Sequence, residues 1–321
     1  MGKCIIQIWS GGRVQEPAVI EGIEWETARK GEPGKLTFTV VKTEGLSFSE
    51  GARVTFWYDD TPVFFGFVFE KQRNKDHHIK VTAYDQLRYL KNKISYVWTG
   101  VRADQVVSRI AEDFKLKAGE LPNTGYIIPK FYKENVSLFD MILDAIDETA
   151  MATGNLYYLY SDYDKLMLKN IKDSTIDILI DASTASDFDY TTSIDKNTYN
   201  RIVLVESEEQ KIRNVAKLDD TKTIQQWGVL QNFVSVNSGS NIKAMAAAML
   251  NLYNRVSRSL TIKRQKGDIR VRAGCGIYLD LNLGDMIVTK QRMLVEKAKH
   301  VFDNDDHYMD LTLQGKEEFY D

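Results

Sequence analysis

The stretch VTAYDQLRYLKNK, residues 81–93, changes from strand periodicity to helix periodicity within a few residues. Its first residues alternate apolar and polar side chains, as in a half-buried strand. Leu87, Leu90 and Ile94 then recur at the three- and four-residue spacing of a helix. The stretch therefore predicts a corner at which a strand ends and a helix begins.

Residues 1–95 have the strand and turn composition of an antiparallel β module. Glycine pairs and the Asp59-Asp60-Thr61-Pro62 run supply the backbone angles that chain reversals need. The stretch 63–69 is apolar on both faces, so we expect both faces to be covered, with a bend at Gly66. A small barrel fits these features best. The expected strands are 5–9, 19–25, 35–41, 53–58, 63–70 and 79–84.

The next part of the chain, residues 96–184, changes to an α+β pattern. Residues 102–114 carry one apolar helical stripe, and a second helix begins after Ser137, whose hydroxyl is a suitable N-cap with Asp140 three residues later. Residues 156–168 then form two short apolar runs separated by polar turn residues, which predicts a hairpin. We expect an α+β region inserted between two β modules.

Strand signals return in residues 185–321, which we expect to form a second β-barrel interrupted by one helix. The helix covers residues 242–253, and Ser240 or Asn241 can cap it. The sequence thus predicts an α+β, mainly β protein with two antiparallel β-barrel domains, 1–95 and 185–321, and an inserted region, 96–184. The expected strands of the second barrel are 200–206, 223–229, 260–266, 286–289, 293–301 and 308–313.

Composition narrows the functional classes. The 321 residues include 42 Lys and Arg against 45 Asp and Glu, so no broad basic field indicates nucleic-acid binding. Two cysteines, Cys4 and Cys275, are too few for a disulfide framework or a four-thiolate zinc site. The N-terminus alternates like a strand and lacks the apolar core of a signal peptide, and no apolar run approaches the roughly twenty residues that cross a bilayer. We expect mature structure at the N-terminus, no membrane insertion and protein partners.

No residue set has the spacing of a catalytic or metal motif. His300 and His307 bracket an acidic stretch that could form an imidazole and carboxylate cluster, but a solvated turn between two strands explains that stretch better. The same stretch lacks the glycine and closing glutamate of an EF-hand. His77-His78 reads as a turn. With no nucleophile elbow or phosphate loop either, we assign no catalytic, cofactor-binding or metal residues and no cofactor.

Aromatic and basic residues have two readings each. A sugar-binding platform could be formed by Trp57, Trp98, Trp227 and the tyrosines at 157, 158 and 160, but strand aromatics are more often core. The basic residues of 263–266 and 270–272 flank Gly267-Asp268, which is consistent with a basic hairpin tip or with a solvated turn. Neither group identifies a ligand.

Beyond the stretch at 81–93, the chain resembles the XkdQ/YqbQ family of phage-tail proteins along nearly its whole length. The segments that carry the resemblance are 123–129, 199–205, 271–276 and His300 with 307–311. The resemblance implies two tube-like β-barrels with inserted domains. It also implies a homotrimeric baseplate hub that joins the sixfold tail tube to the threefold spike, in a virion or tail-like particle assembled in the bacterial cytoplasm.

Two functions remain open at this point. One is the structural hub, whose partners would be the tail-tube hexamer, the spike and other baseplate proteins, and which would be no enzyme. The alternative is a tail-associated cell-wall hydrolase or glycan-binding component. Any two of the acidic residues could form a glycosidase pair, because such carboxylates meet in space and not in sequence.

Overall fold

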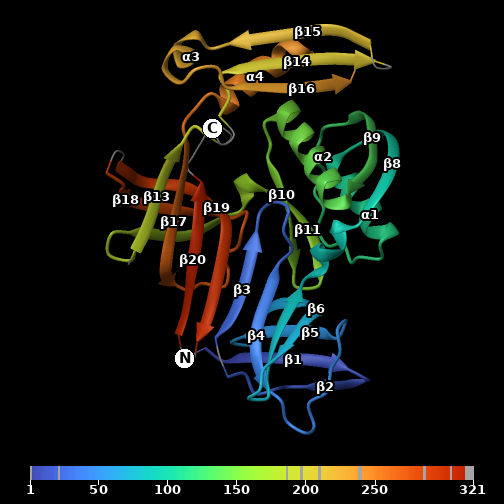
Figure 1. Ribbon diagram of the computed structural model, residues 1–321, viewed down its shortest axis with the longest axis vertical. Helices are drawn as coiled ribbons and strands as arrows, with labels where there is room; N and C mark the ends of the chain where they lie inside the picture. The colour runs from blue at the N-terminus through green and yellow to red at the C-terminus, as the bar shows by residue number, and fades with distance from the viewer. Residues whose placement is uncertain are drawn as a thin grey trace. The chain divides into compact units, whose positions relative to one another are not determined.

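The computed structural model describes residues 2–20, 22–185, 187–195, 198–208, 211–237, 241–284, 287–303 and 306–314. The chain divides into two compact units (Figure 1). Unit 1 comprises Met1–Asp189 with Leu260–Tyr320, and unit 2 comprises Tyr190–Ser259. Each unit is described separately below.

An N-terminal β module forms the first part of unit 1. Its strands are antiparallel, and the order β3-β4-β7-β6-β5-β1-β2 surrounds a core that includes Phe38 and Phe56. The third strand begins at Ile23, whereas Val19 makes only an isolated bridge to Val40, so the predicted strand 19–25 began too early. The strands are β1 Cys4–Ser10, β2 Arg13–Gln15, β3 Ile23–Ala28, β4 Lys35–Val41, β5 Arg53–Tyr58, β6 Thr61–Arg73 and β7 His78–Tyr84.

Gly66 is required in β6 for a steric reason. A Cβ atom at this position would lie 2.2 Å from the carbonyl oxygen of Tyr84 on the neighbouring strand β7. Only glycine lets the two backbones approach so closely. Around it the two faces of β6 differ, since Val63, Phe64 and Val68 are buried while the alternate aromatic side chains are half-buried.

The predicted corner at residues 81–93 is present, but the helix is short. After β7 the chain forms a 3-10 helix, η1 (Gln86–Lys91), with Leu87 and Leu90 buried. Ile94 lies instead in the next strand, β8 (Lys93–Val101), so its helical assignment was wrong. Asn92, with extended backbone angles, ends η1 and starts the strand.

The inserted part of unit 1 packs two helices against two antiparallel strand pairs. The helices α1 (Ala103–Asp113) and α2 (Leu138–Thr153) agree with the sequence patterns, and Ser137 Oγ caps α2 by accepting from the N–H of Asp140 at 3.1 Å. The predicted hairpin is also present. The other elements are β9 Ile128–Ser137, which pairs with β8, the hairpin strands β10 Tyr157–Asp162 and β11 Lys165–Asn170, and η2 Ile171–Asp173.

A C-terminal β module completes unit 1. Its longest strand, β19, pairs with β18 along its first half and with β20 along its second half. The β19–β20 hairpin confirms the predicted reversal before His307; residues 304 and 305 lie outside the described residues. The strands are β12 Thr175–Asp181, β13 Asp187–Ser193, β17 Ser257–Lys266, β18 Gly276–Asn282, β19 Ile287–Asp303 and β20 Asp306–Gln314. The boundary between the units falls within β13, after Asp189, and within β17, before Leu260.

Unit 2 is a three-stranded sheet covered on one face by a helix. Central β14 (Arg201–Glu208) pairs antiparallel with β15 (Lys211–Asp219) and parallel with β16 (Gln231–Asn237). Helix α4 (Ile242–Tyr253), capped by Asn241 as predicted, packs on this sheet.

The predicted strand 223–229 in unit 2 was wrong. This part of the chain is helix α3 (Thr221–Trp227). The Asp220 carboxylate accepts from the N–H of Thr223 at 2.9 Å and caps the helix, and Gly228 follows its last residue. These two local signals outweigh the strand content of the segment.

The fold is therefore mainly β, with 53% strand and 19% helix and with large antiparallel sheets. The strands form no closed ring of hydrogen-bonded neighbours within the part of the chain that the structure describes, so the two predicted barrels are not established. None of the described helices is both long enough and apolar enough to span a bilayer.

Candidate functional site

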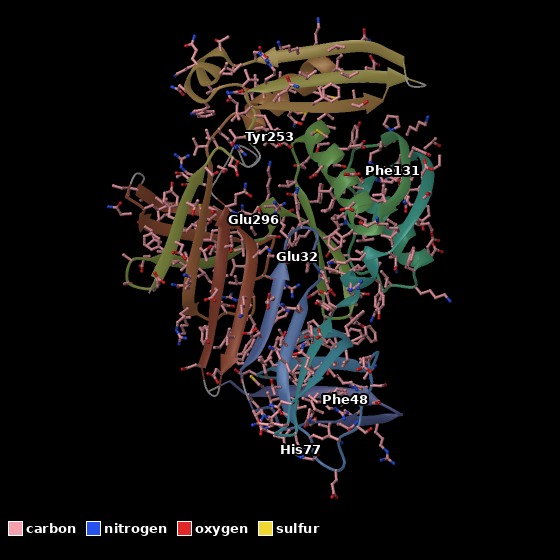
Figure 2. The ribbon with its side chains drawn as sticks, viewed as in Figure 1. Glu32, Phe48, His77, Phe131, Tyr253 and Glu296 are labelled. Atoms are coloured by element: carbon pink, nitrogen blue, oxygen red, sulfur yellow. The ribbon has the colours of Figure 1, made fainter. Side chains whose placement is uncertain are left out.

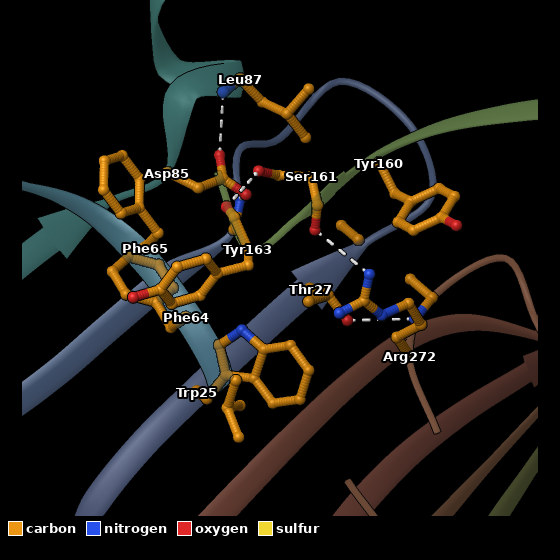
Figure 3. Close-up of a pocket in the computed structure, with 14 residues that line it drawn as sticks. Trp25, Thr27, Phe64, Phe65, Asp85, Leu87, Tyr160, Ser161, Tyr163 and Arg272 are labelled. Carbon is orange, nitrogen blue, oxygen red and sulfur yellow. Dashed lines mark hydrogen bonds between the residues drawn. The ribbon is translucent and has the colours of Figure 1, made fainter. Parts of the chain in front are cut away.

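Two segments noted in the sequence, 81–93 and 271–276, meet in unit 1. Asp85 from the first and Arg272 from the second line the same small hollow, together with the β10–β11 hairpin (Figure 3). The hollow has room for little more than one water molecule. Its other lining residues are Trp25, Thr27, Ala28, Gly34, Val63, Phe64, Phe65, Leu87, Tyr160, Ser161, Tyr163 and Ala273.

Asp85 is a buried carboxyl group with two backbone donors. Its Oδ1 accepts from the N–H of Leu87 and its Oδ2 from the N–H of Gly34, both at 3.0 Å, so it caps η1 and ties it to the turn before β4. A Cβ atom at position 34 would lie 2.3 Å from Oδ2, so Gly34 makes this approach possible. Burial raises the pKa of Asp85 to about 7, although both N–H groups and the Arg272 guanidinium oppose the rise.

Arg272 links three elements around the hollow. Its Nη1 donates to the carbonyl oxygen of Ser161 at 3.1 Å and lies 3.5 Å from Oδ1 of Asp162, both on β10. Its guanidinium carbon lies 4.9 Å from the Tyr160 ring centre and 5.6 Å from that of Trp25 on β3. The sequence left open a basic hairpin tip or a solvated turn, and neither reading fits Arg272, whose side chain is only 15% exposed.

A seam joins the two β modules next to this hollow; we use the word for the antiparallel pairing of β3 with β19. It places Trp25 opposite His300 and makes one continuous sheet from the two modules (Figure 1). Arg29 forms an ion pair with Glu296 at 2.7 Å, with the arginine side chain 9% exposed. Lys297 and Glu32 form an exposed ion pair at 3.0 Å. Figure 2 labels Glu32 and Glu296.

His300 and His307 lie together, as their places on the hairpin allow. His300 is fully buried, stacks on Trp25 with 4.9 Å between ring centres, and places Nε2 2.8 Å from the carbonyl oxygen of Val271. Since a carbonyl only accepts, Nε2 carries the proton, and Nδ1 accepts from His307 Nε2 at 3.0 Å. Burial lowers the pKa to about 3 for His300 and about 4 for His307.

These histidines serve packing rather than ligation in the structure. Their ring nitrogens face each other and a backbone carbonyl, and His307 also stacks on Phe302 with 4.1 Å between ring centres. Among the described residues, no three His, Cys, Asp or Glu side chains lie close enough to hold a metal ion together. The two imidazoles therefore fix the register of the hairpin and of the seam.

The chemistry of the hollow is that of a structural clamp. Both oxygens of Asp85 accept backbone hydrogen bonds, and Arg272 is held by a carbonyl and a carboxylate. The nearest thiol in sequence, Cys275, is buried, and burial raises its pKa. Sequence reasoning missed Asp85 and Arg272 as a pair. An aspartate placed where a strand turns into a helix is an N-cap signal that would have indicated the first.

Comparisons with known proteins establish the family. The model of the YQBQ-like family matches residues 23–314, and the chain belongs to that family. The phage-like element PBSX protein XkdQ of Bacillus subtilis is 30% identical over 308 residues, which are 93% of each chain.

Solved structures share the fold at low identity. A 43 kDa tail protein of prophage MuSo2 from Shewanella oneidensis has a TM-score of 0.69 and 11% identity, with 98% of each chain covered. A type VI secretion component of E. coli, described as similar to the T4 bacteriophage tail proteins gp27 and gp5, has a TM-score of 0.57 and 10% identity over 98% of this chain and 78% of its own.

Proposed function

We propose that this chain is a structural protein of a phage tail or phage-tail-like particle. Its relative XkdQ belongs to a phage-like element, and the fold is shared with a prophage tail protein over nearly the whole of both chains. The described site supports this role, because its polar groups join chain segments to one another. The location we propose is the baseplate of a particle assembled in the bacterial cytoplasm.

Within the particle we propose a baseplate hub that acts as a homotrimer and adapts the sixfold tail tube to the threefold spike. The seam carries this proposal. It holds two antiparallel β modules of one chain in a single sheet through six consecutive residue pairs, Ile23–Ala28 with 297–302. Three such chains present six β modules, which is the number that a hexameric tube requires.

The domain assignment belongs to the same proposal. Residues 1–95 and 185–321 are the two tube-like barrels, and residues 96–184 are the insertion between them. Arg272 contacts the β10–β11 hairpin and would hold the insertion to the second barrel. A rigid connection suits an adaptor, since two modules must keep one spacing to match a ring.

Assembly with the tail tube tests the hub. The full chain is mixed with the tube protein of its own particle and imaged by electron microscopy, and its mass in solution is measured with and without the tube. We expect three copies on the end of each tube, with pseudo-sixfold contacts. A chain that stays monomeric in the presence of tube and spike would contradict the adaptor.

We further propose that the chain is no enzyme. A peptidoglycan digestion assay separates the hub from the alternative of a tail-associated hydrolase or glycan-binding component. The purified chain should release no soluble fragments, and folding monitored by circular dichroism should not change with a chelator. A lytic activity that the chelator abolishes would contradict this part of the proposal.

A further inference from the structure

An aromatic groove lies in unit 1 on the outer face of β6, beside η1 and the end of α1. Its volume is about 400 Å³, within the range of pockets that accept ligands or side chains. We call it the β6 groove and define it by its lining residues. These are Phe65, Phe67, Gln86, Tyr89, Asn92, Phe114, Lys115, Leu116, Lys117 and Asp164.

The groove exists because one face of β6 is only partly covered. Phe65 and Phe67 point to the same face, with ring centres 5.7 Å apart in an edge-to-face arrangement, and Tyr89 of η1 lies 5.9 Å from Phe67. These rings are half-buried. The expectation that both faces of 63–69 are covered therefore holds for one face, and the other keeps apolar surface for a partner.

Polar groups of the groove point to a chain segment as the partner. Gln86 is 5% exposed, and its amide nitrogen has no hydrogen-bond partner among the described residues. Such a donor normally finds an acceptor, and a peptide carbonyl offers one. The groove thus combines aromatic walls with a buried, unsatisfied donor.

The rim of the groove carries one unpaired basic side chain. Lys115, which follows α1 and lines the groove, is exposed and forms no ion pair with any described residue. Lys117, also in the lining, is paired with Asp164. Lys115 therefore favours an acidic partner, and the rings of the groove favour aromatic side chains on it.

One segment of this chain has that chemistry. Residues 315–321, Gly-Lys-Glu-Glu-Phe-Tyr-Asp, lie outside the described residues and carry three acidic side chains beside Phe319 and Tyr320. We propose that residues 315–321 of a second copy of this chain dock in the β6 groove. Phe319 and Tyr320 enter the aromatic groove, and the acidic residues face Lys115. The inference rests on the proposed self-association of the hub.

Sheet order favours a second copy over the same chain. A row of residues that pair directly with one another crosses the sheet from β6 to β20. It consists of Phe67, Tyr84, Lys35, Glu26, Lys299 and Asp310. Five strand spacings separate β6 from β20, which is about 24 Å across the sheet. Gln314 lies four residues further along β20. The five residues from 314 to 319 reach at most about 17 Å, which is less than this path along the sheet, and the difference favours a second copy as the donor of the segment.

A labelled peptide of residues 315–321 tests the docking. It is titrated by fluorescence anisotropy into the full chain carrying Phe319→Ala and Tyr320→Ala, whose own segment is disabled. We expect saturable binding that weakens with salt and falls at least about fivefold with Lys115→Glu. Lys130→Glu, an exposed lysine on β9 away from the groove, is the matched control and should change nothing.

Several results would overturn the inference. They are absence of saturable binding, equal affinity for the Lys115→Glu and Lys130→Glu chains, and equal binding of a peptide that lacks both aromatic residues. Binding of a chitooligosaccharide in the groove without binding of the peptide would assign the groove to a glycan instead. Because Lys115 is exposed, its substitution leaves the fold intact and keeps the test decisive.

Isotope mixing separates a second copy from the same chain. Nitrogen-14 and nitrogen-15 chains are mixed and treated with a carbodiimide, which joins Lys115 to Glu317 or Glu318 without a spacer. Mixed-isotope cross-links support the inference, and same-isotope cross-links alone overturn it. If the native chain forms trimers on tubes but gives no mixed-isotope cross-links, this inference fails while the hub stands. Mixed-isotope cross-links in a native chain that does not bind the tube would support the docking and contradict the hub.

Discussion

Two buried polar centres of unit 1, Asp85 at the corner and the His300–His307 pair at the seam, respond to burial in opposite directions. The pKa of Asp85 is raised to about 7, whereas the pKa values of His300 and His307 are lowered to about 3 and about 4. The cause is the same, because burial disfavours the charged form of each group. Both centres therefore favour neutral side chains in the folded chain.

The two centres make the stability of the folded chain depend on pH in opposite directions. Asp85 has a folded pKa above its ordinary 3.8, so its contribution to stability is complete below that value and is lost as the pH rises through about 7. The histidines have folded pKa values below their ordinary 6.5, so their contributions are present above 6.5 and are lost as the pH falls through about 4 and about 3. Acidification below neutral pH thus strengthens the corner and weakens the seam.

The largest effect is expected at the seam. His300→Ala removes a fully buried ring, its stacking on Trp25 and its hydrogen bond to the Val271 carbonyl. We expect the free energy of unfolding to fall by about 3 to 5 kcal/mol, as for other large-to-small core changes. Denaturant unfolding checks it. His77→Asn, in an exposed turn at positive φ, is the control and should leave the midpoint unchanged.

A comparable loss is expected at the corner. Leu87 is 3% exposed in the core of the inserted part, and Leu87→Ala should lower the free energy of unfolding by about 2 to 5 kcal/mol. Leu179→Ala on β12, where the side chain is 41% exposed, is the matched control with an expected change below about 1 kcal/mol. An unchanged midpoint for Leu87→Ala would show that the corner does not stabilise the junction.

The pH dependence of the free energy of unfolding tests the titration of Asp85. Asp85→Asn removes the titratable group of the corner. The free energy of unfolding of the variant, relative to that of the native chain, should therefore increase as the pH rises from 4 to 7. The gain is at most about 1.4 kcal/mol per pH unit. Unfolding free energies of both chains measured across this range give the difference directly. A difference that stays constant with pH would show that Asp85 titrates near its ordinary pKa.

The smallest effect is expected for the two cysteines. Burial raises the pKa of Cys4 to about 11 and also raises that of Cys275, so neither thiol is set up to react. Cys4→Ser and Cys275→Ser should leave particle assembly intact and cost about 1 kcal/mol or less each. Particle counts by electron microscopy check this. Loss of particles in a variant that still folds would give the cysteine a role at an interface.

Local signals in the sequence predicted the elements that they control. Ser137 and Asn241 cap α2 and α4 as expected, and the hairpin of β10 and β11 falls on its two apolar runs. The β19–β20 hairpin likewise follows from the polar stretch between its strands. In each case the determining residues lie within a few positions of the element.

Predictions failed where a local pattern supported two structures. The spacing of Leu87, Leu90 and Ile94 fits a helix, but the chain pairs Ile94 with Val136 in the β8–β9 ribbon, which only the tertiary fold provides. In the segment 223–229, strand-like residues lie in a helix because the Asp220 side chain caps it. At Ile94, pairing with a distant strand outweighed the helical spacing. In 223–229, the helix cap outweighed the strand propensity.

The residues alone were enough to predict the mainly β composition, the caps and turns, and the resemblance to phage-tail relatives. The seam, the contact of Asp85 with Gly34 and the contact of Arg272 with β10 became visible only in the folded chain. The physical reason is distance along the chain. Arg29 and Glu296 are 267 residues apart and Thr27 and Ala273 are 246 apart, so their contacts depend on the packing of whole modules and leave no pattern in neighbouring residues.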